Sequence, residues 1–196
     1  MLTRKRSEKL RSVASNRQSG LVVVLEDIHD PHNAAAVLRT CDAFGVQDVY
    51  FIFEQEEPFN PRRVGKATSS SANKWLTFTI SNSTRRTLQK LQKQGYEIIA
   101  TVADTNAKDI FATKLTSKKV AVLIGNEHRG LSSTAVELSD TLVTIPMLGM
   151  VQSLNLSVTA AILMFEITRQ RQKQKKQYLL SVPLANKLYK QFVKKQ

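Results

Sequence analysis

The chain has 196 residues, 42% of them hydrophobic, which fits a soluble protein with one folded domain and short terminal extensions. Its single cysteine, Cys41, excludes a disulfide framework and a cysteine-based metal cluster, and it favours a reducing, cytoplasmic location. The apolar runs are too short to span a bilayer and the charged N-terminus lacks the apolar core of a secretory signal, so no membrane partner is expected.

The formal net charge of +13 is confined to the two ends of the sequence. Residues 1–20 carry six Arg or Lys against one Glu, residues 166–196 carry nine against one, and residues 21–165 carry 14 of each sign. This segregation favours a polyanion such as nucleic acid as the partner, because each neutralised phosphate releases a counterion. Solvated helix faces, or binding to an anionic membrane surface without a spanning segment, are the less favoured alternatives.

Strands and helices are expected to alternate along the chain. A buried strand over 21–26 leads to a helix with Asp30 as N-cap and Pro31 at its first position, closed by Gly45. The other strands are expected at 46–53, 75–80, 96–102, 119–124 and 141–145, and the other helical segments at 84–94, 132–138, 153–171 and the basic C-terminal end. This order predicts an α/β fold with a parallel sheet, helices on both faces and ligands beyond the carboxyl ends of the strands.

Several common site motifs are absent from the sequence. No GxGxxG follows the first strand and no GxxxxGK[ST] occurs, so the usual dinucleotide and P-loop sites are unsupported. The three histidines lack metal-ligand spacing, and no metal is expected. G-x-S-x-G is also missing, which weakens a hydrolase interpretation.

Polar residues on the first helix and after the 119–124 strand are candidates for a site. Arg39 lies about 150° from the centre of the apolar stripe of its helix, so it points away from its own core and towards solvent, a polyanion or a second subunit. A solvated arginine is the favoured interpretation from the residues alone. Glu127 directly follows a buried strand, where it is either a site carboxylate or a partner of a helix dipole.

The stretch IPMLGMVQSLNLS combines unlike residues at one strand-to-helix junction. Gly149 allows a tight turn that brings backbone close to a ligand, and Ser153 or Asn155 can cap the long helix. Methionines beside bare backbone suit an adenine and a thioether, although a capped turn with apolar filling explains the same residues. Thr101, at the end of another strand, is either a site residue or a plain strand threonine.

Three segments together resemble the SPOUT class of RNA methyltransferases, and within it the TrmH branch that methylates ribose 2′-hydroxyls. They are HDPHNAAAVLRTCDAFGV, LIGNEHRGLS and IPMLGMVQSLNLSVTAAILMFE, in the family's order and spacing. The resemblance covers roughly residues 20–171 and implies a parallel sheet flanked by helices with a deep C-terminal trefoil knot. The predicted organisation is a basic helical extension over 1–19, a methyltransferase domain over 20–171 and a basic helical extension over 172–196.

The resemblance also implies S-adenosylmethionine as the cofactor, tRNA as a partner and a homodimer with the active site at the subunit interface. The implied catalytic residues are Arg39, Asn33, Glu127, Ser153 and Asn155. The implied cofactor-binding residues are Thr101, Gly125, Ile145, Met147, Gly149 and Leu154. The implied RNA-binding residues are Arg169, Arg171 and Arg11.

The implied reaction is attack of a 2′-oxygen on the methyl group of a sulfonium, which needs in-line positioning and help with the hydroxyl proton. The family assigns the proton to the arginine, but a guanidinium stays protonated in nearly all protein settings. Arg39 could instead hold a phosphate or stabilise the alkoxide, with Glu127 or a phosphate oxygen accepting the proton.

Guanosine 18 in the D-loop of tRNA is the leading substrate that the resemblance implies. The alternatives are ribosomal RNA or another tRNA position, and, from a different class, a basic RNA-binding protein without a cofactor.

Overall fold

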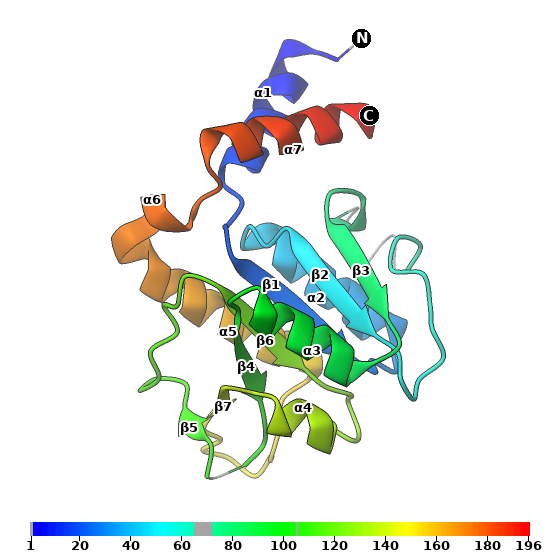
Figure 1. Ribbon diagram of the computed structural model, residues 1–196, viewed down its shortest axis with the longest axis vertical. Helices are drawn as coiled ribbons and strands as arrows, with labels where there is room; N and C mark the ends of the chain where they lie inside the picture. Colours follow the sequence, from blue (N-terminus) through cyan, green and yellow to red (C-terminus); the bar gives the residue numbers. More distant parts are fainter. Residues whose placement is uncertain (1, 65–71, 105) are drawn as a thin grey trace.

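The computed structural model describes residues 2–64, 72–104 and 106–196, with the backbone alone at 174 and 175 (Figure 1). Its sheet has seven strands in the order β3-β2-β1-β6-β4-β7-β5, and every pairing is parallel. The strands are β1 (Leu21–Glu26), β2 (Asp48–Ile52), β3 (Thr77–Ser81), β4 (Glu97–Thr101), β5 (Lys108–Asp109), β6 (Val120–Ile124) and β7 (Thr141–Thr144). The predicted parallel α/β sheet is confirmed, whereas the knot stays a prediction.

The described helices largely follow the predicted segments. They are α1 (Arg4–Ser15), α2 (Pro31–Ala43), α3 (Thr84–Lys93), α4 (Ser133–Glu137), α5 (Leu156–Arg171), α6 (Lys175–Tyr178) and α7 (Val182–Lys194), with 3-10 turns at Ala72–Lys74 and Gln172–Gln174. None of them is long and apolar enough to cross a membrane.

Alternation along β1 divides the apolar core into two layers. Val23 and Leu25 pack with the buried residues of α2 and α5, whereas Val22 and Val24 pack with α3 and with Ala135 of α4. All six residues of β1 are buried because helices cover both faces of a parallel sheet. The central strands are therefore fixed rigidly, and their carboxyl ends lie at one edge of the sheet.

The helix α2 begins and ends as its sequence predicts. The Asp30 side chain accepts a hydrogen bond from the backbone of His32, and Pro31 occupies the first turn. Gly45 follows with a φ of +75°, and a Cβ there would lie 2.7 Å from the Asn16 carbonyl. Glycine is therefore required for both conformation and space.

The two basic ends of the chain form one unit, the terminal helical pair α1 and α7. Leu10 and Ala14 of α1 pack against Leu188 and Phe192 of α7 in a small core separate from the sheet. The pair lies at the opposite end of the molecule from β5 and β7, with both chain termini close together (Figure 1). These two helices carry eight Arg or Lys against one Glu, a net +7 of the formal +13, and much of the remaining excess lies at residues 169–176, outside the pair.

Candidate functional site

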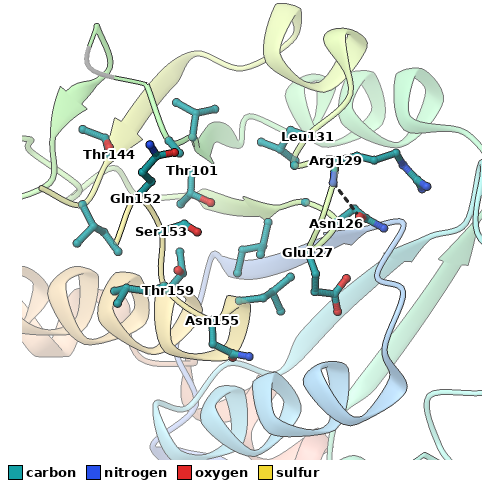
Figure 2. A pocket seen from close by; sticks show the side chains of 18 of the residues that line it. Thr101, Asn126, Glu127, Arg129, Leu131, Thr144, Gln152, Ser153, Asn155 and Thr159 are labelled. Carbon is teal, nitrogen blue, oxygen red and sulfur yellow. Dashed lines mark hydrogen bonds between the residues drawn. The ribbon is translucent and has the colours of Figure 1, made fainter. Parts of the chain in front are cut away.

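A cavity of about 750 Å³ opens beyond the carboxyl ends of β4, β6 and β7 (Figure 2). Its wall is formed by residues of four segments, together with Asn33 of α2 and Val136 of α4. The segments are 101–103 at the end of β4, 124–131 at the end of β6, 143–147 in and after β7, and 152–159 around the start of α5. This is where ligands bind in α/β sheets, and the volume lies within the range for small-molecule pockets. The cavity lies where the sequence predicts a ligand site, and ligand binding there stays a prediction.

The cavity brings together most of the side chains that the sequence singles out. The predicted site residues in its wall are Asn33, Thr101, Gly125, Glu127, Ile145, Met147, Ser153, Leu154 and Asn155. Two predicted site residues, Arg39 and Gly149, do not line it. Arg39 lies on the exposed side of α2, and the space where a Cβ on Gly149 would project is open.

The Glu127 carboxylate is fixed by three N–H donors. Its Oε2 accepts a hydrogen bond from the His29 backbone at 2.9 Å. Its Oε1 accepts from the Asp30 backbone at 3.2 Å and from Asn33 Nδ2 at 3.0 Å. These donors stabilise the negative charge and tie the loop after β6 to the loop that precedes α2.

Asn155 rather than Ser153 caps α5, so this helix begins at Leu156, later than predicted. Asn155 Oδ1 accepts from the backbone and the hydroxyl of Ser157, at 2.8 and 2.6 Å. Its Nδ2 donates to Asn33 Oδ1 at 3.1 Å. A continuous chain of hydrogen bonds therefore runs from Glu127 through Asn33 to the first turn of α5.

Gly125 is required by packing within the loop 125–130. A Cβ there would lie 2.4 Å from the Gly130 carbonyl carbon, because Asn126 and Gly130 exchange backbone hydrogen bonds of 2.9 and 3.0 Å. Asn126 closes the same turn, since its Oδ1 accepts from the His128 and Arg129 backbones. The glycine thus shapes the cavity wall through contacts within its own loop.

A charged cluster that the sequence analysis did not single out lies beside this loop. Glu56 accepts from Arg129 at 2.6 Å and contacts His29 Nδ1 at 2.9 Å, while the His29 and His128 rings meet edge to face. The hydrogen bond and the charge of Glu56 raise the pKa of His29, and the hydrogen bonds from His29 and Arg129 lower the pKa of Glu56. Figure 2 shows the Arg129 side chain extending away from Thr101 and Ser153.

Other wall residues also escaped the sequence analysis. They include polar side chains able to orient a ligand, namely Thr144, Gln152 and Thr159, together with His128 and Arg129. Gln152 and Thr159 lie within the third motif, IPMLGMVQSLNLSVTAAILMFE, and this position could have identified them as candidate site residues. No group of three or more His, Cys, Asp or Glu is placed to hold a metal ion in the part of the chain that the structure describes.

The three predicted RNA-binding arginines have different surroundings. Arg11 is exposed on α1, 4.3 Å from the Tyr189 ring of α7. Arg169 is exposed and makes a two-point contact with Glu166, which lowers the pKa of that carboxyl and raises that of the arginine. Arg171 is only 2% exposed and lies inside the molecule.

Comparison with known proteins points to one family. Residues 20–165 match the profile of the SpoU rRNA Methylase family. A tRNA (guanosine(18)-2′-O)-methyltransferase from Thermus thermophilus is 39% identical over 171 residues, 87% of this chain and 86% of that protein. The one from Escherichia coli strain K12 is 34% identical over 85% of this chain and 71% of its own length.

Solved structures lead to the same family. The crystal structure of the A. aeolicus TrmH/SpoU tRNA modifying enzyme superposes with a TM-score of 0.87 at 29% identity, covering 97% of this chain and 95% of that one. The SpoU methyltransferase AviRb from Streptomyces viridochromogenes, solved in complex with AdoMet, gives 0.69 at 25% identity over 79% of this chain and 62% of that one. The resemblance drawn from the three motifs is confirmed, and the chain belongs to the SpoU rRNA methylase family of RNA methyltransferases.

Proposed function

We propose that this protein transfers a methyl group from S-adenosylmethionine to the ribose 2′-oxygen of guanosine 18 in tRNA. The observation that carries the proposal is the single cavity wall that gathers Asn33, Glu127, Ser153 and Asn155 beyond the strand ends. The Thermus, Escherichia and Aquifex relatives are tRNA (guanosine(18)-2′-O)-methyltransferases, which supports this substrate. Ribosomal RNA is the second candidate, since the matching family profile carries that description.

The residues of the cavity fit the proposed cofactor. Apolar side chains of Leu131, Ile145 and Leu154 offer contact area for an adenine, while the threonines and Gln152 offer polar partners for ribose and amino-acid groups. When bound, S-adenosylmethionine would supply an electrophilic methyl group on a sulfonium. The chain's part is to hold that group and the RNA in line and to exclude water.

Glu127 acts in this proposal by positioning. Its two oxygens already accept three N–H groups, and the hydrogen-bond chain through Asn33 fixes the start of α5 beside the reacting ribose. The acceptor for the hydroxyl proton is then a phosphate oxygen of the RNA, with Arg39 holding that phosphate and stabilising the alkoxide. Near-normal turnover in Arg39→Lys would exclude Arg39 as the base, and Glu127→Gln tests whether the carboxylate charge is needed.

We further propose a homodimer in which the partner subunit's Arg39 completes each site. Arg39 does not line the cavity of its own chain. Apolar side chains are exposed in the loop between β7 and α5, which borders that cavity: Leu148 and Met150 are fully exposed and Val151 is more than half exposed. Soluble monomers rarely leave such apolar side chains together in water, and the family resemblance implies a homodimer. We therefore propose that a second copy of the chain covers them.

The reaction is tested with total tRNA and with ribosomal RNA as methyl acceptors, followed by mapping of the labelled nucleotide. Incorporation at guanosine 18 of tRNA is expected. Incorporation only into ribosomal RNA would support the second candidate, and a calorimetric titration without S-adenosylmethionine binding would favour the RNA-binding protein without a cofactor.

The shared site is tested by mixing two inactive variants, Arg39→Ala and Asn155→Ala, after unfolding and refolding them together. If each site uses one residue from each subunit, mixed dimers hold one intact site and activity returns to roughly a quarter of the wild-type level, from random pairing of two-site dimers. A mixture that stays as inactive as its parents would contradict the interface site.

A further inference from the structure

The terminal helical pair is connected to the sheet domain by a small joint, formed by residues 16–20 and 178–181. These two segments run side by side in opposite directions. Gln18 and Leu179 form an antiparallel bridge, the Ser19 N–H donates to the Tyr178 carbonyl at 2.6 Å, and the Leu180 N–H donates to the Arg17 carbonyl at 3.0 Å. The joint therefore sets the angle of the basic pair relative to the cavity.

Arg17 holds the joint to the end of α2. It is 1% exposed and donates to the carbonyls of Val46 and Asp42, at 3.0 and 3.2 Å, and to the Asp42 carboxylate. Its guanidinium also lies 5.9 Å from the Phe192 ring of α7. A single buried side chain thus contacts the sheet domain and the terminal pair together.

Arg171 holds the joint from the end of α5. It donates to Ser117 O at 3.0 Å, to Gln18 Oε1 at 3.2 Å and to Gly20 O at 3.4 Å. Its guanidinium stacks 4.5 Å from the Tyr178 ring, whose hydroxyl donates to Thr116 O at 2.7 Å. Burial lowers the pKa of Arg171 to about 10, which fits a cation surrounded by protein.

Gln18 joins the two arginine sites. It is 8% exposed, its Nε2 donates to Phe44 O at 2.7 Å and to Thr168 Oγ1 at 2.9 Å, and its Oε1 accepts from Arg171. A cavity of about 620 Å³ lies alongside, lined by both arginines. The helices α1, α2 and α5 all end there, and helix C-termini carry partial negative charge, so this cavity is unsuited to an anion.

We propose that Arg17 and Arg171 are positioning residues that hold the terminal helical pair in its RNA-binding orientation before RNA arrives, without contacting phosphate themselves. The inference rests on the proposed RNA methyltransferase function. It changes the expected role of Arg171 from a direct RNA contact to a support for contacts made by exposed residues of α1 and α7. The burial of both guanidinium groups and their carbonyl partners carry the argument.

The first test compares Arg171→Met with Arg169→Met, the exposed arginine two positions away. If loosening leaves the pair correctly oriented a tenth of the time, the KM for tRNA in Arg171→Met rises about tenfold, because apparent affinity scales with the competent fraction. Its kcat at saturating tRNA and its cofactor affinity stay within twofold of wild type. The slope of log affinity for tRNA against log salt concentration stays at the wild-type value in Arg171→Met. In Arg169→Met the magnitude of this slope falls by about one, the change expected for one lost phosphate contact.

The second test needs neither RNA nor activity. Amide hydrogen exchange at Ser19 and Leu180 is measured in the free protein, where faster exchange in Arg171→Met than in wild type and Arg169→Met is expected. Tyr178→Phe removes the hydrogen bond to Thr116 and leaves both arginines in place. It should raise the exchange rate and the KM for tRNA, each by less than Arg171→Met does. This variant keeps the ring and serves if Arg171→Met fails to fold.

Unchanged exchange at the joint, an unchanged KM, or a salt slope reduced by about one in Arg171→Met would each overturn the proposal. Tyr178→Phe with wild-type exchange and KM would overturn it as well. Failure of the proposed function would give a different result, because the wild-type protein would then transfer no methyl group to RNA. The hydrogen-exchange measurement would still decide whether Arg171 holds the joint.

Discussion

The two ends of α5 differ in how their polar groups are used. Just before its first turn, Gln152 and Ser153 are exposed in the wall of an open cavity, and Asn155 caps the helix. At its last turn, Arg171 is buried, and its two terminal nitrogens donate to oxygens of Gln18, Gly20 and Ser117. One end is left open to a ligand and the other is completed by the protein itself, so buried charge by itself does not mark a binding site.

The largest effect is expected at the open end, in Asn155→Ala. Loss of the link to Asn33 should lower kcat/KM for tRNA on the order of 100-fold, because small misplacements at the reacting centre are costly. Loss of the cap should lower the free energy of unfolding by about 1 kcal/mol. Steady-state methyl transfer and urea denaturation measure the two effects.

Asn155→Asp separates these effects. Aspartate caps helices as well as asparagine does, but it cannot donate to Asn33 Oδ1. Stability should return while activity stays low. Full activity in this variant would show that the link to Asn33 is unimportant.

Arg17, which lines the same cavity as Arg171 at the closed end, should show the opposite pattern when replaced in Arg17→Met, a loss of stability without a loss of cofactor binding. Removing a buried guanidinium with several hydrogen bonds should lower the free energy of unfolding by about 2 kcal/mol, a moderate value because the Asp42 side chain is 34% exposed and can be hydrated. Cofactor affinity by calorimetry should be unchanged. An unfolding free energy equal to that of wild type would mean that the joint adds nothing to stability.

A smaller effect is expected from Ser153→Ala. The Ser153 hydroxyl is exposed in the cavity wall, and no hydrogen bond to a described residue is recorded for it. We expect kcat/KM to fall roughly tenfold through loss of one neutral hydrogen bond to the ligand, with an unchanged unfolding midpoint. A shifted midpoint with normal kinetics would place Ser153 among the structural residues.

The smallest expected effect is a shift in the pKa of His29, which lies beside Glu56 and Glu127. Glu56 and Glu127 raise its pKa and Arg129 lowers it, with the His128 ring alongside. While Glu56 stays ionised, the charged contact is therefore fully formed below pH 6.5, and it is lost as the pH rises through the raised pKa of His29. NMR titration should show a midpoint above 6.5 in wild type and closer to 6.5 in Glu56→Gln; identical midpoints would exclude the contact.

Local sequence patterns predicted most elements of the fold. The β-branched run of β1 and the cap and proline of α2 carried enough signal to place both elements correctly. The strand β5 was not predicted, because Lys108 and Asp109 are exposed and show no apolar alternation. The start of α5 was misplaced because Ser153 and Asn155 are both good caps, and only tertiary contact with Asn33 selects the second.

The sequence identified most residues of the candidate site, but it did not show how they are arranged in space. Motif resemblance located most of the cavity wall, although no local pattern showed that Asn33 and Asn155, far apart in sequence, share a hydrogen bond. The role of Glu56 depends on a loop packed beside 125–130, which periodicity cannot reveal. The burial of Arg171 was equally hidden, since basic residues near a chain end are usually exposed.

Methyl transfer to a tRNA that lacks the 2′-oxygen of nucleotide 18 tests whether this oxygen is the methyl acceptor. Two synthetic tRNAs are compared with labelled S-adenosylmethionine, one unmodified and one with 2′-deoxyguanosine at position 18. We expect incorporation of the label into the first tRNA and none into the second. Equal incorporation into both would contradict 2′-O-methylation of guanosine 18.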